Sequence, residues 1–335
     1  MDFLKDVIKE IGDDYATVAN KIDDTERTVD TGSYILNALV SGSVFGGVSG
    51  NKITAIAGET STGKTYFSLA IVKNFLDKHP DGGVMYFDTE SAITKGLLES
   101  RGIDLERVGI INVVTIEQFR NRALTVVDKY LGLEESDRKP MMFVLDSLGM
   151  LSTEKEIKDA LDDKQVRDMT KSQLVKGAFR MLTLKLGQAN VPLIVTNHTY
   201  DVIGAYVPTK EMGGGSGLKY AASTIIYLSK GKEKDGTEVV GNIIKAKTVK
   251  SRLSRENRQV EIRLFYDERG LDRYYGLLDL ADKHGVIKKV ANRYEINGKK
   301  VYAKEVYKNP EKYFTPELMQ ALDEVSVKEF TYGGE

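Results

Sequence analysis

Residues 58–65 read GETSTGKT, in which two glycines are separated by four residues and followed by lysine and threonine. An apolar run, KITAIA, precedes this segment and a helical pattern, KTYFSLAIVKNFL, follows it, so the expected structure is strand, loop and helix. The N–H groups of such a loop and of the helix N-terminus can hold the phosphates of ATP. A glycine-rich turn without a ligand is the alternative. The predicted ATP-binding residues are Gly58, Glu59, Thr60, Ser61, Thr62, Gly63, Lys64, Thr65 and Tyr66.

Charged and hydroxyl groups near this loop could hydrolyse the bound nucleotide. Lys64 is expected to reach the β and γ phosphates, and the Thr65 hydroxyl to take one position on Mg²⁺. Asp146 ends the apolar run MMFVLDS and could anchor the water shell of the Mg²⁺, although a helix cap is the alternative. In YFDTES, Glu90 could orient the attacking water, and Asp88, nearer the strand, is expected to be structural.

A further polar group follows the apolar run VPLIVTN, which ends at Asn197 and is followed by His198. In parallel α/β sheets, ligands gather beyond the carboxyl ends of the strands, so we expect Glu90, Asp146 and His198 to lie near one another. After His198, nearly twenty residues match neither a helical nor a strand period before an apolar pattern resumes at Leu218. Loops of this length inside a compact domain are uncommon, and are usually functional or disordered.

The arrangement of apolar runs predicts the fold that positions these groups. From Asn51 to about residue 230, the runs alternate with helical patterns, which predicts a doubly wound α/β domain with a mostly parallel sheet and strands buried on both faces. The runs are KITAIAG, GGVMYFDTE, VGIINVVT, MMFVLDS, VPLIVTN and STIIYLSK. Next, EKDGTE predicts a turn, with GNIIKAKTVK and NRQVEIRLFY as antiparallel strands.

The two ends of the chain show separate patterns. Near the N-terminus, Leu4, Ile8, Ile11 and Tyr15 form a helical stripe. From about residue 270 a distinct unit is predicted, with the helix YYGLLDLADKHG, a hairpin turning at Asn297 and Gly298, and the helix TPELMQALDEV.

Composition narrows the class of protein. The chain has 335 residues, of which 41% are hydrophobic and 29% charged, enough for one substantial core and a smaller second unit. The 48 basic residues against 49 acidic ones give no general signal for nucleic-acid binding. Cysteine is absent and three histidines have unrelated spacing, so a metal is expected to have oxygen ligands. No apolar run reaches the roughly 18–20 residues that span a bilayer, and the first residues lack a signal-peptide pattern, so we expect a cytoplasmic protein without a membrane partner.

Several segments, in their order along the chain, resemble the RecA-type recombinases, most closely the UvsX branch of T-even-like bacteriophages. These segments are TVDTGSYILNALVSG, YFDTES, VLDSLG, DALDDKQVRDMT, VTNHTY, MGGGSGLKYAAS and YYGLLDLADKHGVI. The resemblance implies a RecA-like P-loop ATPase core, an N-terminal helical oligomerisation segment and a small α/β C-terminal domain. The expected boundaries are 1–30 for the N-terminal helix and linker, 31–268 for the core and 269–335 for the C-terminal domain.

The resemblance also implies an activity. Such proteins form helical filaments on single-stranded DNA with ATP and Mg²⁺, hydrolyse ATP when DNA is bound, and exchange strands with homologous double-stranded DNA. For this chain, that implies a role in phage recombination, repair and recombination-dependent replication in the host cytoplasm, with loading or mediator proteins and single-strand-binding proteins as partners. Glu90 matches the water-activating residue and His198 the sensor of the γ-phosphate, so the expected catalytic residues are Lys64, Glu90, His198, Lys250 and Arg252. A satisfied polar residue at a strand end is the alternative for His198.

Two DNA-facing loops are implied at about residues 152–169 and 198–217. From its mixture of basic and acidic residues alone, the first could equally be a solvated helix surface. Glycines in the second would let backbone N–H groups approach phosphates, and tyrosines could pack against bases or serve as hydrophobic anchors. The expected DNA contacts are Met169, Arg180, Tyr200, Tyr206, Gly213, Gly214 and Gly215.

A subunit interface is implied at Lys219, Tyr220, Lys250 and Arg252. Lys250 and Arg252 match paired cations that reach the ATP of a neighbouring subunit and act like arginine fingers; an edge strand blunted by charge is the alternative. Two other functions remain open from sequence: a hexameric helicase or clock-type ATPase with the same fold, and a non-catalytic, ATP-gated recombination mediator.

Overall fold

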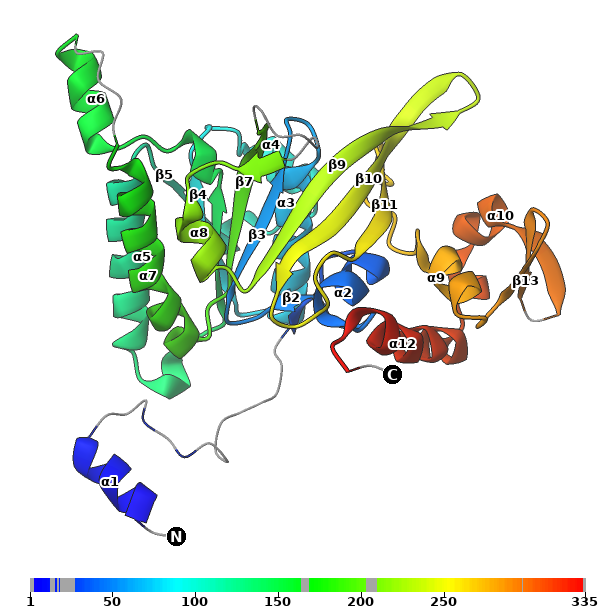
Figure 1. The fold of residues 1–335 in the computed structure, drawn as a ribbon, viewed down its shortest axis with the longest axis horizontal. Helices are drawn as coiled ribbons and strands as arrows, with labels where there is room; N and C mark the ends of the chain where they lie inside the picture. The colour runs from blue at the N-terminus through cyan, green and yellow to red at the C-terminus, as the bar shows by residue number, and fades with distance from the viewer. Residues whose placement is uncertain are drawn as a thin grey trace.

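The computed structural model describes residues 3–12, 16, 18, 28–163, 169–202, 210–296 and 298–333. Its centre is a nine-stranded sheet in the order β11-β10-β9-β3-β7-β6-β4-β5, with β8 paired to β7 (Figure 1). The strands from β9 to β5 in this order pair in parallel, whereas β9, β10 and β11 pair antiparallel. This sheet confirms the predicted mostly parallel α/β class. The bounds are β3 Ile53–Gly58, β4 Gly83–Asp88, β5 Val108–Asn112, β6 Met141–Asp146, β7 Leu193–Asp201, β8 Lys210–Met212, β9 Thr224–Asp235, β10 Glu238–Ser251 and β11 Gln259–Phe265.

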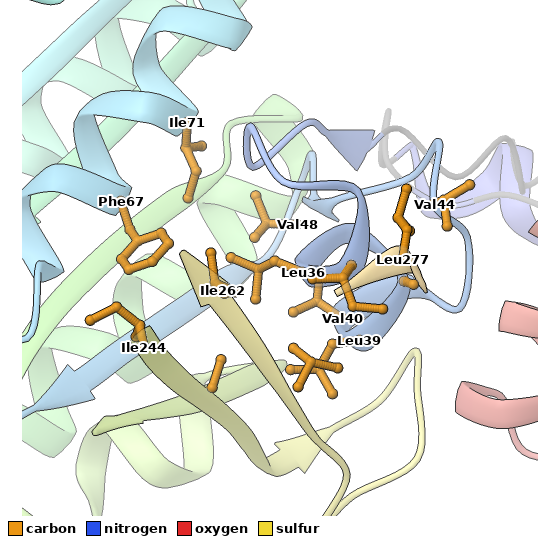
Figure 2. Packing of buried hydrophobic residues seen from close by; sticks show 14 of the residues in the cluster. Leu36, Leu39, Val40, Val44, Val48, Phe67, Ile71, Ile244, Ile262 and Leu277 are labelled. Atoms are coloured by element: carbon orange, nitrogen blue, oxygen red, sulfur yellow. The ribbon is translucent and has the colours of Figure 1, made fainter. Parts of the chain in front are cut away.

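Helices cover both faces of the sheet because successive strand residues point to opposite sides. In β6, Met142 and Val144 join the apolar cluster of α2 (Tyr34–Ser41) and α3 (Lys64–Lys78). Phe143 and Leu145 join the other cluster, with α5 (Ile116–Leu131) and α7 (Lys171–Ala189). Figure 2 shows the first cluster, where apolar side chains of α2 and α3 gather against Ile244 and Ile262 of the antiparallel strands.

Three details differ from the sequence expectations. β5 is not buried on both faces, and its Ile110 is 40% exposed, because it is the edge strand with a neighbour on one side only. The EKDGTE turn joins β9 to β10, because β9 runs on to Asp235 and leaves Gly236, at φ 63°, within a tight turn. The apolar pattern also gave no prediction of α2 or of the short pair β1 (Thr28–Val29) and β2 (Val48–Ser49), whereas α6 (Glu154–Leu161) matches the alternative of a solvated helix surface.

The C-terminal unit contains the predicted helices and hairpin. These are α9 (Leu277–Lys283), the hairpin of β13 (Arg293–Ile296) with β14 (Lys299–Tyr302), and α12 (Pro316–Phe330). The structure adds β12 (Lys288–Val290), α10 (Ala303–Lys308) and α11 (Pro310–Tyr313). Asn297 lies outside the described residues. Leu277 of α9 belongs to the same buried cluster as Leu36 of α2, so this unit packs on the core (Figure 2).

The N-terminal stripe forms α1 (Phe3–Ile11), whose described residues are all at least partly exposed. Phe3, Leu4 and Ile11 are 75%, 59% and 61% exposed, and Figure 1 shows the helix away from the sheet. Tyr15 lies outside the described residues. Within the described parts of the chain, none of the helices combines the length and the apolar character needed to cross a membrane.

Candidate active site

The loop between β3 and α3 winds around the side chain of Lys64. The Lys64 Nζ donates hydrogen bonds to the carbonyl oxygens of Gly58 (3.0 Å) and Glu59 (2.9 Å), and Thr62 Oγ1 donates to Glu59 O (2.8 Å). A Cβ at Gly58 would lie 2.6 Å from Thr62 Oγ1, so only glycine fits there. Gly63 precedes α3 at φ 88° and, within the described chain, no side chain caps this helix N-terminus. The free N–H groups therefore suit phosphate oxygens.

The charge of Lys64 is expensive to keep in this position. Burial lowers the pKa of the ammonium, while the carboxylates of Asp146 and Glu90 raise it less. The residue is only 8% exposed. An anionic phosphate at the loop would add opposite charge beside this buried ammonium, beyond that of the two carboxylates, so the loop fits a nucleotide.

The carboxylate of Asp146 is held by two hydroxyl groups. Tyr86 OH donates to Oδ2 (2.8 Å), and Thr196 Oγ1 donates to Oδ1. Tyr86 also contacts Ser68 Oγ (3.3 Å), which donates to the carbonyl oxygen of Thr65 (2.8 Å). Burial, reinforced by Asp146, raises the pKa of Tyr86 well above its usual value, so the phenol stays a donor. The network therefore links both predicted Mg²⁺ residues, Thr65 and Asp146.

The oxygen atoms at this site suit the few protein ligands that Mg²⁺ takes when it is bound with a nucleotide. Within the described ranges, His, Cys, Asp and Glu form no group of three or more that could hold a metal. Mg²⁺ bound with a nucleotide usually takes one or two protein oxygens and completes its shell with phosphate oxygens and water. The Thr65 hydroxyl and the Asp146 carboxylate match that pattern, because each oxygen of Asp146 accepts one protein hydrogen bond and keeps a second lone pair.

Sheet register brings the acidic residues together. Asp88 at the end of β4 is paired with Asp146 at the end of β6. Asp88 accepts hydrogen bonds from the N–H groups of Glu90 (3.0 Å), Ala92 (3.4 Å) and Ile93 (3.1 Å), so its carboxylate holds the turn that carries Glu90. This is the structural position that the sequence favoured for Asp88.

Glu90 faces two possible donors across the site. Ser147 Oγ donates to Glu90 Oε1 (2.9 Å), and His198 Nε2 lies 3.6 Å from the same oxygen. His198 comes from β7, where it pairs with Gly58 at the end of β3. The expected meeting of Glu90 with His198 beside the phosphate loop is therefore present in the structure, and Ser147 is an addition that the sequence gave no signal for.

The described parts of the segment after His198 include regular structure, where the sequence suggested an irregular loop. β7 continues to Asp201 and pairs antiparallel with β8, which starts at Lys210. Asn197 Nδ2 donates to Gly213 O (2.8 Å), and Gly213 N donates to His198 O (3.1 Å). These hydrogen bonds join two strands whose side chains do not alternate between apolar and polar, so the sequence pattern did not indicate strands here. Residues 203–209, with Tyr206, lie outside the described residues.

Several predicted DNA contacts surround a cavity of about 400 Å³. Its lining includes Tyr200, Gly213, Gly214, Gly215 and Lys171. Gly214 and Gly215 have φ values of 83° and 75°, so both use backbone conformations that favour glycine.

Other predicted DNA contacts are exposed on the adjoining segments. Met169 is 77% and Tyr200 58% exposed, and Arg180 is exposed on α7. Of the first predicted DNA loop, residues 164–168 lie outside the described part of the chain.

The predicted interface residues also lie together. Lys250 Nζ donates to the carbonyl oxygens of Lys219 (2.6 Å) and Tyr220 (3.1 Å), in α8 (Ser216–Ala221). Burial, followed by the charge of Arg252, lowers the pKa of Lys250. Tyr220 is 69% exposed.

Strand register separates these cations from the phosphate loop of their own chain. Lys250 pairs with Ile225 near the start of β9, whereas Gly58 pairs with Leu228, three residues further along that strand.

An ion pair that sequence reasoning missed joins the phosphate loop to the hairpin. Lys210 of β8 pairs with Glu59, and this hydrogen bond lowers the pKa of the Glu59 carboxyl. Lys230 Nζ lies 3.5 Å from Thr60 O. Because Lys210 is far from residue 59 in sequence, no local motif could have indicated this contact.

Comparisons with known proteins agree with this arrangement. The family model described as the RecA N-terminal domain matches residues 2–272. The recombination and repair protein of Enterobacteria phage T4 is 33% identical over 274 residues, which cover 82% of this chain and 68% of the T4 protein. Protein RecA of Paracoccus denitrificans is 30% identical over 302 residues, or 89% of this chain and 78% of that protein. Protein RecA of Chloroherpeton thalassium is 31% identical over 290 residues, or 86% and 74%.

Proposed function

The chain belongs to the RecA family and is a recombinase of homologous recombination and repair, and on that premise we propose that it forms helical filaments on single-stranded DNA, hydrolyses ATP there and exchanges strands with homologous duplex DNA. One observation carries the coupling of these activities. His198 faces Glu90 with its side chain and is hydrogen-bonded through its backbone to Gly213, beside the cavity of predicted DNA contacts. A movement of this hairpin on DNA would therefore move His198 relative to Glu90.

The geometry of the loop and its neighbours supports the following proposed catalytic roles. Glu90 takes a proton from the attacking water as the water oxygen bonds to the γ-phosphorus. The bond from the γ-phosphorus to its bridging oxygen breaks, and ADP leaves with the electron pair. Lys64 compensates the charge on the β and γ phosphates. Thr65, and Asp146 through the metal's water shell, would hold Mg²⁺, which would supply further electrostatic stabilisation.

We assign Lys250 and Arg252 to the ATP of the neighbouring subunit. Because Lys250 pairs with Ile225, three residues before Leu228, the β9 residue that pairs with Gly58, reaching its own phosphate loop would require crossing roughly 10 Å along the strand. Lys219 and Tyr220 accompany Lys250 at that surface. An isolated subunit would then lack part of its transition-state charge stabilisation, which explains a requirement for both filament and DNA.

The same proposal assigns the parts of the chain. Residues 1–30 contact a neighbouring subunit, supported by the exposed apolar side chains of α1; residues 31–268 form the ATPase core; residues 269–335 form the small C-terminal domain. Met169, Arg180, Tyr200, Tyr206 and the three glycines contact DNA. Loading and single-strand-binding proteins are the further partners that we propose.

The test is an ATPase titration with and without single-stranded DNA at several salt concentrations, with Glu90→Ala as the inactive control. Hydrolysis should rise on adding DNA and fall steeply with salt, since phosphate contacts release counterions. Absence of stimulation would refute the proposal. Closed rings in electron micrographs would favour a hexameric helicase or clock-type ATPase, and ATP binding without hydrolysis or strand exchange would favour a mediator.

A further inference from the structure

The hydroxyl of Ser147 is placed to set the orientation of the proposed catalytic carboxylate. Ser147 Oγ donates to Glu90 Oε1 at 2.9 Å. Ser147 itself is 1% exposed, whereas the Glu90 side chain is 38% exposed and carries several rotatable bonds. A buried donor therefore restrains a side chain that would otherwise sample several rotamers.

The backbone around Ser147 is fixed at both of its polar groups. Its N–H donates to Thr89 Oγ1 (2.7 Å), and the Thr89 hydroxyl donates to the carbonyl oxygen of Ser147 (3.0 Å). Thr89 N also donates to Asp146 O (2.9 Å), which joins the ends of β4 and β6. Ser147 is thus anchored to the same turn that carries Glu90, so the donor and the acceptor keep a constant separation.

The two oxygens of Glu90 have different surroundings. Oε1 accepts a hydrogen bond from the Ser147 hydroxyl and lies 3.6 Å from His198 Nε2. Oε2 accepts no hydrogen bond from any residue that the structure describes. The carboxylate therefore has one oxygen committed to the protein and one that can accept a proton from water.

We propose that Ser147 is a positioning residue for ATP hydrolysis, which holds Oε1 so that Oε2 of Glu90 takes the proton of the attacking water. This inference rests on the proposed role of Glu90. The hydrogen bonds of the Ser147 backbone go to Thr89 at the end of β4, whereas the next residues, Leu148 and Gly149, border the cavity beside the β7–β8 hairpin. His198 approaches the same oxygen from that hairpin, so Ser147 sets the resting orientation against which any movement of His198 acts.

The experiment compares full-length Ser147→Ala and Ser147→Cys with the wild type in DNA-stimulated hydrolysis. Alanine removes the donor, and cysteine nearly keeps the volume but donates only weakly. We expect kcat to fall roughly 10- to 100-fold in both, as for loss of one hydrogen bond to a charged group, with KM for ATP and binding of single-stranded DNA unchanged within about twofold. Ser326→Ala is the matched control, because Ser326 is also a buried serine, and its hydroxyl donates a hydrogen bond to Leu322 O in α12.

A double-variant cycle separates positioning from a general structural role. If Ser147 acts through Glu90, adding Ser147→Ala to Glu90→Ala should lower the residual rate by less than about twofold. A further 10-fold loss in that background, or an unchanged kcat in folded Ser147→Ala, would overturn the inference. Unfolding of both Ser147 variants at the assay temperature, with Ser326→Ala stable, would also overturn it, since Ser147 would then be needed for folding. Failure of the proposed function is recognised separately, as a wild type that DNA does not stimulate.

Discussion

Replacing Lys250 with methionine removes an ammonium group that has two roles. It donates hydrogen bonds within its own chain, and in the proposed filament it contacts the ATP of the neighbouring subunit. In its own chain, Lys250 donates to Lys219 O and Tyr220 O, two carbonyls in the last turn of α8 that lack helical partners. Hydrogen bonds to charged groups contribute about 1.5–3 kcal/mol. Because Lys250 is partly exposed, we expect a loss of roughly 1–2 kcal/mol in the free energy of unfolding and a fall of about 1.5–3 °C in Tm.

The effect on hydrolysis should be much larger than this loss of stability. An arginine finger contributes about 10³–10⁵ in kcat, and since Lys250 shares that task with Arg252, we expect Lys250→Met to lower DNA-stimulated hydrolysis at least about 100-fold. Binding of ATP by single subunits should remain nearly normal, because Lys250 lies away from its own phosphate loop. Lys73→Met, which breaks an exposed ion pair with Asp77 in α3, is the control and should leave both quantities unchanged.

Mixed filaments test whether the cation acts on the neighbouring subunit. Equimolar Lys250→Met and Glu90→Ala chains should recover about a quarter of the wild-type rate, because half of the sites keep Glu90 and half of those face an intact Lys250. A mixture no more active than its separate components would refute the reasoning. Equal loss of ATP binding and hydrolysis in Lys250→Met alone would instead place the ammonium in the ATP site of its own chain.

Two further predictions concern the glycine segment and the C-terminal unit. Gly215 has φ 75° and ψ −167°, and a Cβ there would lie 2.8 Å from Ser172 Oγ, so Gly215→Ala should lower the free energy of unfolding by about 1–3 kcal/mol and lower Tm. Gly187→Ala in α7 is the control and should not lower Tm, because the space around its Cβ position is open. Equal Tm values for the two variants in thermal unfolding would contradict this prediction. Burial, followed by Glu261 and Glu233, raises the pKa of Tyr275 to about 12. A raised pKa contributes stability that is present below pH 10 and lost as the pH rises toward 12. In urea unfolding from pH 9 to 12, the free energy of unfolding of Tyr275→Phe should therefore fall by about 3 kcal/mol less than that of the wild type. Equal changes with pH in both proteins would contradict the prediction.

Much of the central sheet could be predicted because its strands are short, apolar and separated by helical periods. β3, β4, β6 and α3 follow directly from such runs, and the glycines around the phosphate loop mark where the backbone must approach a ligand. α2 was not predicted, since its YILNALVS sequence is buried almost all round and shows no polar face to set a period. The extension of β7 with β8 was missed for a different reason. Its register depends on the side chain of Asn197 bonding to Gly213, a contact that alternation of apolar residues does not report.

The candidate site divides in the same way. Lys64, Glu90, Asp146 and His198 stand at predicted strand ends or in a motif, so their meeting could be expected from sequence. Ser147 could not be identified, because a serine after a strand-ending aspartate has no distinguishing type or spacing. The network of Tyr86, Ser68 and Thr196 around Asp146, and the ion pair of Lys210 with Glu59, depend on residues brought together only by folding.

Sheet register also determines where this chain can change in length. Gly58 is paired with His198, and Asp88 with Asp146, through hydrogen bonds between neighbouring strands. Residues inserted in the connections around α4 (Lys95–Ser100) or α5 would therefore leave the reactive groups at the same positions relative to one another at the strand ends. Deleting one residue from β3, β4, β6 or β7 would instead turn every later side chain of that strand to the opposite face. Insertions and deletions among related chains should accumulate in the helical connections and be absent from these four strands.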